Sequence, residues 1–117
     1  ADIDVQSNPT LSLYDAKLAK GSSAGKIVIR YQLTASKMAS SIGVSSIKIY
    51  KSDGTYITTI TGTTANKLIA NNKTTYSNTY TYSGVSGTSY YAKVTMFATA
   101  GGVTSSGTVK TNTVTAP

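Results

Sequence analysis

Apolar and polar residues alternate along most of this chain with a period of two, the pattern of half-buried β-strands. The sequence KIVIRYQLTA, residues 26–35, places an apolar side chain at every second position from Ile27 to Leu33. Residues 14–20 (YDAKLAK) alternate in the same way, and the turn-forming sequence GSSAG, residues 21–25, separates the two segments. We therefore predict that the two segments form a β-hairpin.

A second hairpin is predicted further along the chain. Residues 47–49 place two isoleucines on one face, and residues 56–61 return as the partner strand. Asp53-Gly54 lies between them and supplies residues that tolerate the positive φ of a tight hairpin turn. Residues 35–43 are expected to be a longer connection with room for one helical turn. Residues 63–73 are expected to cross between sheets.

The C-terminal half also has the strand pattern. Residues 76–82 place three tyrosines and Asn78 at alternate positions on one face, and residues 90–98 turn Tyr90 and four further apolar side chains inward. Val109 and Val114 differ in phase, so a bulge or a crossing is expected in the last strand, residues 103–115. Seven or eight short antiparallel strands with frequent turns predict an all-β fold, a β-sandwich.

The length of 117 residues predicts a single domain, residues 10–117, preceded by an N-terminal edge segment, residues 1–9. Residues 2–5 alternate between Asp and apolar side chains before Pro9, as in a short edge strand. This segment can pair with its own sheet, or with a neighbour's sheet to give strand exchange and filaments. We expect pairing within the chain, because two buried apolar side chains contribute about 3–6 kcal/mol, less than many estimates of the association cost.

One short motif indicates the kind of sandwich. In the sequence SGTSYYAKV, residues 86–94, a tight turn carries Gly87-Thr88 and Tyr90 begins the next strand. This motif resembles the tyrosine corner of immunoglobulin-like and fibronectin type III domains. The resemblance implies that the Tyr90 hydroxyl caps the backbone a few residues upstream while the ring enters the core. It implies an immunoglobulin/fibronectin-III-like fold and leaves the function open.

A second resemblance extends over most of the chain. Its segments are YDAKLAKGSSAGKIVIRYQLTAS, SIGVSSIKIYKSDGTYITTITG, TYTYSGVSGTSYYAKVTMFA and TNTVTA. They are similar to a group of small secreted single-domain proteins of anaerobic Gram-positive bacteria that has no assigned activity. The resemblance implies export from the cell and supplies no site residues. The start of the chain at Ala1, without methionine, fits the same expectation of a secreted, extracellular protein.

Charge and hydropathy exclude some classes of partner. Eleven Lys and Arg residues outnumber four Asp residues and give a net charge of +7. The basic residues are spread singly along the chain, and all but Arg30 are lysines, so we expect no specific binding of nucleic acid. No apolar run approaches the roughly 20 residues of a membrane span, so none is expected.

The composition also argues against catalysis. The chain has no His, Cys or Glu, the residues on which most acid–base, nucleophilic and metal chemistry depends. We therefore expect no enzyme activity, no metal site and no cofactor. One covalent alternative is an intramolecular amide bond between Lys17 and Asn112, which lie on the predicted early and last strands.

The predicted pairing of residues 47–49 with residues 90–98 brings a set of polar and aromatic side chains to one outer face. This candidate binding face contains Lys48, Tyr50, Tyr91, Lys93, Phe97 and the adjacent Thr95. Exposed aromatic side chains beside lysines suit contact with a ligand, here a cell-surface or host glycan or protein. The competing interpretation is simple cross-strand stabilisation of a solvated face. A second functional hypothesis is a structural subunit that self-associates into an extracellular polymer through residues 1–9.

Overall fold

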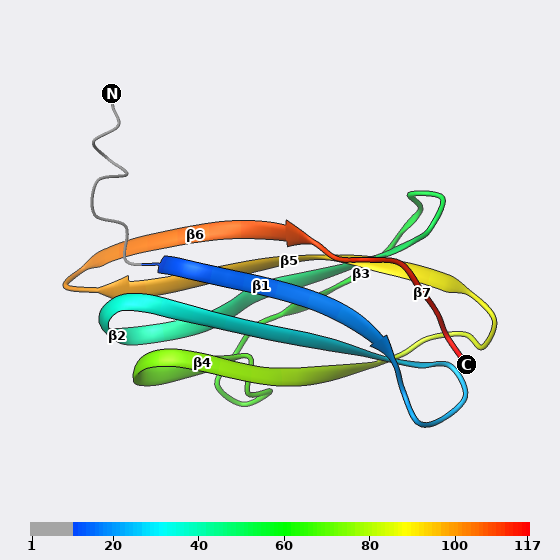
Figure 1. Cartoon of the computed structure of the whole chain (residues 1–117), viewed down its shortest axis with the longest axis horizontal. Helices are drawn as coiled ribbons and strands as arrows, with labels where there is room; N and C mark the ends of the chain where they lie inside the picture. Colours follow the sequence, from blue (N-terminus) through cyan, green and yellow to red (C-terminus); the bar gives the residue numbers. More distant parts are fainter. Residues whose placement is uncertain (1–10) are drawn as a thin grey trace.

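The computed structural model describes residues 11–117, which form seven β-strands and no helix (Figure 1). The strands are β1 (Leu11–Lys20), β2 (Lys26–Lys51), β3 (Tyr56–Thr61), β4 (Ile69–Ser83), β5 (Ser89–Ala100), β6 (Val103–Lys110) and β7 (Val114–Thr115). All of their pairings are antiparallel, which confirms the all-β prediction. No helix of the described residues could cross a membrane. The expected edge segment, residues 1–9, lies outside the described residues, so its pairing stays a prediction.

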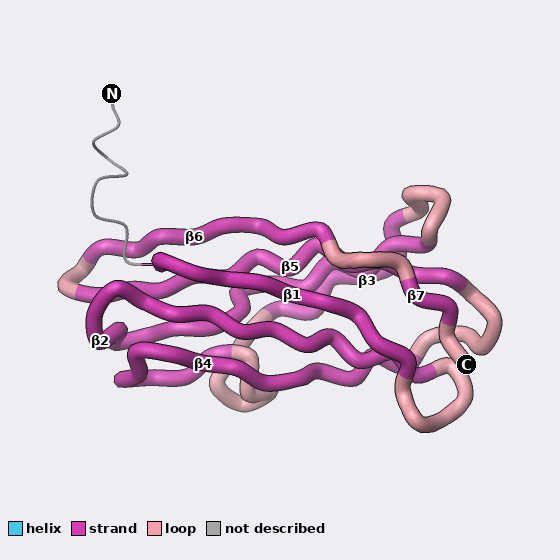
Figure 2. The backbone as a smooth tube through the Cα atoms, viewed as in Figure 1, coloured by secondary structure: helices cyan, strands magenta, loops and turns pink. Residues whose placement is uncertain are grey.

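The long strand β2 pairs with four other strands and runs through both layers of the sheet. Its first part, residues 26–35, pairs with β1 and with most of β4. Its second part, residues 39–51, pairs with β3, β5 and the first residues of β4. Figure 2 shows β2 and β4 both turning back at the same end of the molecule, so that one curled sheet provides both layers. The predicted connection with a helical turn at residues 35–43 is therefore wrong. Ala35 and Ala39 are buried at this bend while residues 36–38 are exposed, and small inward side chains let the two layers meet closely.

The core lies between the two layers. One layer contains β1 with the first part of β2 and most of β4, and the other contains β3, β5, β6 and β7 with the second part of β2. The predicted inward positions are confirmed, because Ile27 and Ile29 in one layer, and Ile47 and Val94 in the other, are fully buried. Each such side chain contributes roughly 1.5–3 kcal/mol when it leaves water.

A side chain joins the two ends of the curled sheet. The Asn112 carboxamide oxygen accepts the backbone N–H of Leu18 at 2.9 Å, and its nitrogen donates to the Leu18 carbonyl at 3.1 Å. Asn112 thus bonds to β1 as the backbone of a neighbouring strand would. The Asn112 carboxamide thus bonds to the backbone of Leu18, whereas the side chain of Lys17, its predicted partner in an amide bond, is exposed on the outer face.

The predicted tyrosine corner is present. The backbone N–H of Val85 donates to the Tyr90 hydroxyl at 2.9 Å, five residues upstream, and the Tyr90 ring is buried. The ring packs against Gly84, where an added Cβ would lie 2.8 Å from a ring carbon. The irregularity expected in the last strand is also present, because β6 ends at Lys110 and β7 begins at Val114.

Candidate functional site

The candidate binding face lies on the outer side of the layer that contains β5. The register of β2 against β5 places Lys48 opposite Lys93 and Tyr50 opposite Tyr91, as the sequence predicted for neighbouring strands. Phe97 lies further along β5, opposite Gly43. All five predicted residues of this face therefore share one surface, and whether that surface binds a ligand stays a prediction.

Two residues that were not predicted from the sequence, Lys110 and Tyr56, extend this face. Lys110 of β6 lies opposite Lys93, so Lys48, Lys93 and Lys110 form a row across three adjacent strands. Tyr56 of β3 lies opposite Tyr50. The Asp53-Gly54 turn could have placed Tyr56 opposite Tyr50, because it specifies the hairpin of β2 and β3. The position of Lys110 on this face follows from the register of β6 against β5, which no local sequence pattern specifies.

The tyrosines of this face stack across the strands. The Tyr50 and Tyr91 rings are nearly parallel, with centroids 5.2 Å apart and planes 9° apart, and Tyr56 meets Tyr50 edge-on at 5.8 Å. The Lys93 ammonium lies 5.3 Å from the centroid of the Tyr50 ring, and the Lys110 ammonium lies 4.7 Å from that of Tyr91. We call these six residues the lysine–tyrosine patch: Lys48, Lys93, Lys110, Tyr50, Tyr56 and Tyr91.

A shallow hollow of about 460 Å³ continues the same face beyond the lysine row. Half-buried Phe97 forms part of its lining, and the loop between β3 and β4 borders it at Gly62. That loop is held against β2, because the N–H of Val44 donates to the Leu68 carbonyl at 2.8 Å. The remaining lining residues are mostly hydroxylated, namely Ser45, Ile69, Thr95, Thr99, Thr104 and Ser106.

The electrostatics of this face are dominated by the lysines. Within residues 11–117 the carboxylate side chains are Asp15 and Asp53. Asp15 lies in the other layer, and Asp53 lies in the hairpin turn, where its side chain accepts the N–H of Thr55 at 2.9 Å. Hydrogen bonding from the Thr55 side chain, then from the Thr55 backbone N–H, and to a lesser extent the charge of Lys51, lower the pKa of the Asp53 carboxyl. Neither carboxylate faces the lysine row in the sheet register.

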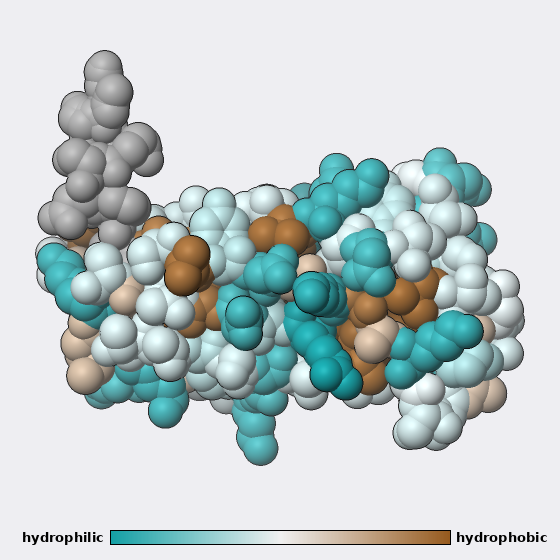
Figure 3. Space-filling view, viewed as in Figure 1, coloured by the Kyte–Doolittle hydropathy of each residue, from teal (hydrophilic) through white to brown (hydrophobic). Residues whose placement is uncertain are grey.

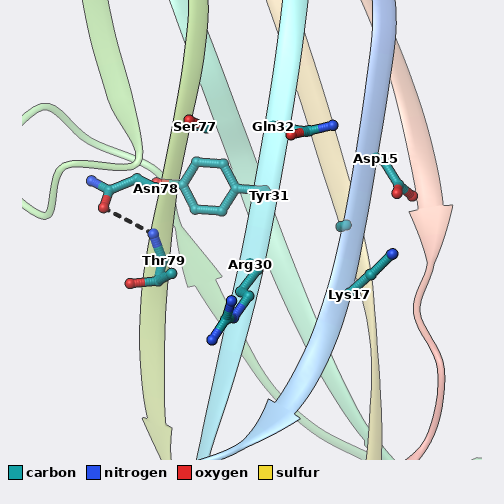
Figure 4. A pocket seen from close by; sticks show the side chains of 9 residues that line it. Asp15, Lys17, Arg30, Tyr31, Gln32, Ser77, Asn78 and Thr79 are labelled. Carbon is teal, nitrogen blue, oxygen red and sulfur yellow. Dashed lines mark hydrogen bonds between the residues drawn. The ribbon is translucent and has the colours of Figure 1, made fainter.

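A second hollow lies on the outer face of the opposite layer (Figure 4). It measures about 440 Å³, and its side chains come from β1, β2 and β4. The strand register arranges them in two rows, one of Asp15, Gln32 and Ser77 and one of Lys17, Arg30 and Thr79. Figure 3 shows the face of the molecule over β1, where small apolar areas are separated by hydrophilic surface. This hollow has a mixed charge and lacks the stacked tyrosines of the other face.

The described residues contain no group of three or more His, Cys, Asp or Glu side chains that could hold a metal ion. Comparison with known proteins adds no assignment, because no family model and no curated protein matches the sequence. The candidate site therefore stands on its own geometry.

Proposed function

We propose that this protein is a secreted, non-enzymatic module that binds a glycan or a protein on a cell surface or host through the lysine–tyrosine patch. The observation that carries the proposal is the in-register row of Lys48, Lys93 and Lys110 beside stacked tyrosines. Export is supported by the resemblance to the group of secreted proteins. An immunoglobulin/fibronectin-III-like origin of the curled sheet is supported by the Tyr90 corner.

The row is poorly explained as a stabilising feature of the sheet. Like charges directly opposite each other on adjacent strands destabilise a sheet, and Lys93 has a lysine on both sides. The cation–π contacts of Lys93 and Lys110 with tyrosine rings offset part of this repulsion, since each stabilises the fold by about 0.5–1 kcal/mol at an exposed site. An oppositely charged residue at position 93 would serve stability better, so the repeated lysines favour an external negative partner.

The proposal is tested on a glycan array and by pulldown from host-cell lysate, followed by identification of each partner with the purified protein. The wild type is compared with Tyr50→Ala/Tyr91→Ala, and Ser77→Ala/Thr79→Ala on the opposite layer is the control. We expect the tyrosine variant to lose the ligands that the wild type and the control retain. Equal retention by a folded tyrosine variant would remove this face as the binding site.

Self-association is a second candidate function, and the sheet edges favour it. In the described part of the chain, β1 pairs only with β2 and β6 pairs only with β5, so each has an edge to which a strand could add, except at Leu18 of β1, whose backbone groups already bond to Asn112. Sedimentation of the full chain and of a chain lacking residues 1–8 tests this function. Polymers that form only with the full chain would favour the structural subunit over the binding module.

A further inference from the structure

We propose that the ligand of the lysine–tyrosine patch is an anionic polysaccharide that crosses β2, β5 and β6 along the lysine row. This inference rests on the proposed function and specifies the chemical class of the ligand. Sulfate or carboxylate groups repeated along a sugar chain would meet one ammonium group on each strand. Lys48, Lys93 and Lys110 supply these groups, and all three side chains are exposed.

The sheet sets the spacing of the charges. Neighbouring strands lie about 4.8 Å apart, so the backbone positions of the three lysines span about 10 Å across the sheet. Each flexible lysine side chain carries a compact charge with three rotatable donors, which suits a series of anions better than one fixed planar group. A bound polyanion would also neutralise the repulsion between neighbouring lysines. The row therefore favours one extended chain of charges over a single small anion.

The aromatic geometry favours a saccharide over a single-stranded nucleic acid. Bases bind such surfaces by stacking on free aromatic faces. The parallel Tyr50 and Tyr91 rings already face each other, the Lys110 ammonium lies over Tyr91, and Tyr56 meets Tyr50 edge-on. These contacts occupy ring faces that a base would need. The ammonium groups and the surrounding hydroxyls remain available to a hydroxylated anionic chain.

The surroundings of the row supply hydrogen-bonding groups for sugar hydroxyls. Thr59 lies opposite Lys48 on β3, and its hydroxyl is 2.6 Å from that of Tyr56. On the side toward the Phe97 hollow, Thr95 and Thr108 lie opposite each other, with hydroxyl oxygens 3.0 Å apart. Hydroxyl groups that can donate or accept thus lie at the β3 end of the charged row and along its side toward the Phe97 hollow.

The inference is tested by affinity electrophoresis and calorimetry with four probes: heparin, polygalacturonate, neutral dextran and a single-stranded oligothymidylate. The test variant is Lys48→Gln/Lys93→Gln/Lys110→Gln. The control, Lys17→Gln/Lys20→Gln/Lys73→Gln, changes the net charge equally on exposed sites away from the row. We expect the wild type to bind heparin or polygalacturonate in about 50 mM NaCl and to release it in about 500 mM NaCl. The test variant should lose about tenfold or more in affinity, as three exposed charge contacts allow, and the control much less.

Several results would overturn the inference. Equal losses in the two lysine variants would mean that net charge, and not the row, attracts the polysaccharide. Tighter binding of the oligothymidylate than of either anionic polysaccharide would assign the face to nucleic acid. Salt-independent binding of dextran would contradict an anionic ligand and leave the proposed function standing. Failure to bind any of the four probes would also overturn the inference, while the glycan array and the pulldown would still decide the proposed function.

Discussion

Two adjacent tyrosines in β5 have opposite environments, and this contrast gives a direct test of the strand phase. The Tyr90 ring is buried and its hydroxyl accepts the N–H of Val85, whereas Tyr91 stacks with Tyr50 on the outer face. We expect Tyr90→Phe to lower the free energy of unfolding by about 1–2 kcal/mol, because the partly buried N–H of Val85 loses its acceptor. Urea unfolding of the two single variants measures the effect.

Tyr91→Phe is the matched control for this substitution. It removes the same hydroxyl group from the outer face and keeps the ring that stacks with Tyr50. We expect it to change stability by less than about 0.5 kcal/mol. A larger loss in Tyr91→Phe than in Tyr90→Phe would contradict the inward and outward assignment of β5.

The side chain of Asn112 gives a second test at the scale of one residue. It satisfies both the N–H and the carbonyl of Leu18, which no other strand of the described residues pairs on that side. We expect Asn112→Ala to cost about 2 kcal/mol, because two partly buried backbone groups lose their partner. Asn112→Asp keeps the acceptor and loses the donor, so it should also destabilise the fold. Wild-type stability in Asn112→Ala would mean that this bridge does not hold the sheet edges together.

At the scale of elements, the loop between β3 and β4 contacts the backbone of β2 closely, and this contact requires a glycine at position 43. Gly43 has φ +152°, and a Cβ there would lie 2.1 Å from the Leu68 carbonyl oxygen. We expect Gly43→Ala to destabilise the protein by more than about 3 kcal/mol or to prevent folding, since backbone must move to relieve the clash. Circular dichroism and thermal unfolding measure this effect.

Gly54 in the hairpin turn is the control for Gly43. It also has a positive φ, +93°, but no atom lies within 4 Å of an added Cβ. Gly54→Ala should therefore cost only the backbone strain, about 1 kcal/mol. Similar losses in the two variants would show that strain alone, and not the close approach of Leu68, requires glycine at position 43.

The lysine row predicts that stability and binding change in opposite directions. In Lys93→Glu the new carboxylate lies between Lys48 and Lys110, so two like-charge pairs become two opposite-charge pairs. We expect the free energy of unfolding to rise by about 0.5–1 kcal/mol at low salt, after the loss of the Tyr50 contact, and the gain to shrink at high salt. Binding of anionic polysaccharide should be lost in the same variant.

Lys93→Gln distinguishes the loss of lysine–lysine repulsion from the gain of opposite-charge attraction in Lys93→Glu. It removes the repulsion without adding attraction, so its stability should lie between those of the wild type and Lys93→Glu. A Lys93→Glu protein less stable than the wild type at low salt would contradict the view that the row costs stability. In that case the lysine row would no longer favour an external negative partner.

The sequence predicted those elements whose signals are local. The alternation from Ile27 to Leu33 and the Asp53-Gly54 turn specified two hairpins, and the turn before Tyr90 specified the corner. The bend of β2 was missed because the exposed residues 36–38 interrupt the alternation as a loop would. Asn112 contacts Leu18, 94 residues away, and no local pattern records such a contact. Lys110 was missed for the same reason, because its place beside Lys93 follows from the pairing of β6 with β5 and not from a local pattern.

At the scale of the whole molecule, the curled sheet presents two different outer faces. One has rows of mixed charge that include Asp15 and Arg30, and the other has the lysine–tyrosine patch. The bend of β2 joins the two layers, and Asn112 closes the opposite side. A two-layer support of this kind holds the lysines at the spacing of the strands, and every residue of the lysine–tyrosine patch lies on a strand and none on a loop.

The response of the whole molecule to alkaline solution depends on Tyr31, which is buried, and on Tyr82, which is half-buried. The Tyr31 hydroxyl donates to the Lys67 carbonyl at 3.1 Å, and burial, followed by the nearby Tyr76, raises the pKa of Tyr31 above its ordinary value of 10.0. Burial also raises the pKa of Tyr82. Because these pKa values are higher in the folded state, their stabilising contribution is complete below about pH 10 and is lost as the pH rises toward the folded-state values.

Urea unfolding between about pH 9 and pH 12 measures this loss, and Tyr31→Phe assigns it. The variant should be less stable than the wild type at pH 9, because it lacks the hydrogen bond to Lys67, yet its stability should fall less steeply with rising pH. Tyr56→Phe, at an exposed position of β3, is the control for the removal of a tyrosine hydroxyl and should leave the stability at pH 9 close to that of the wild type. An equally steep fall in Tyr31→Phe would mean that groups other than Tyr31 govern the alkaline transition.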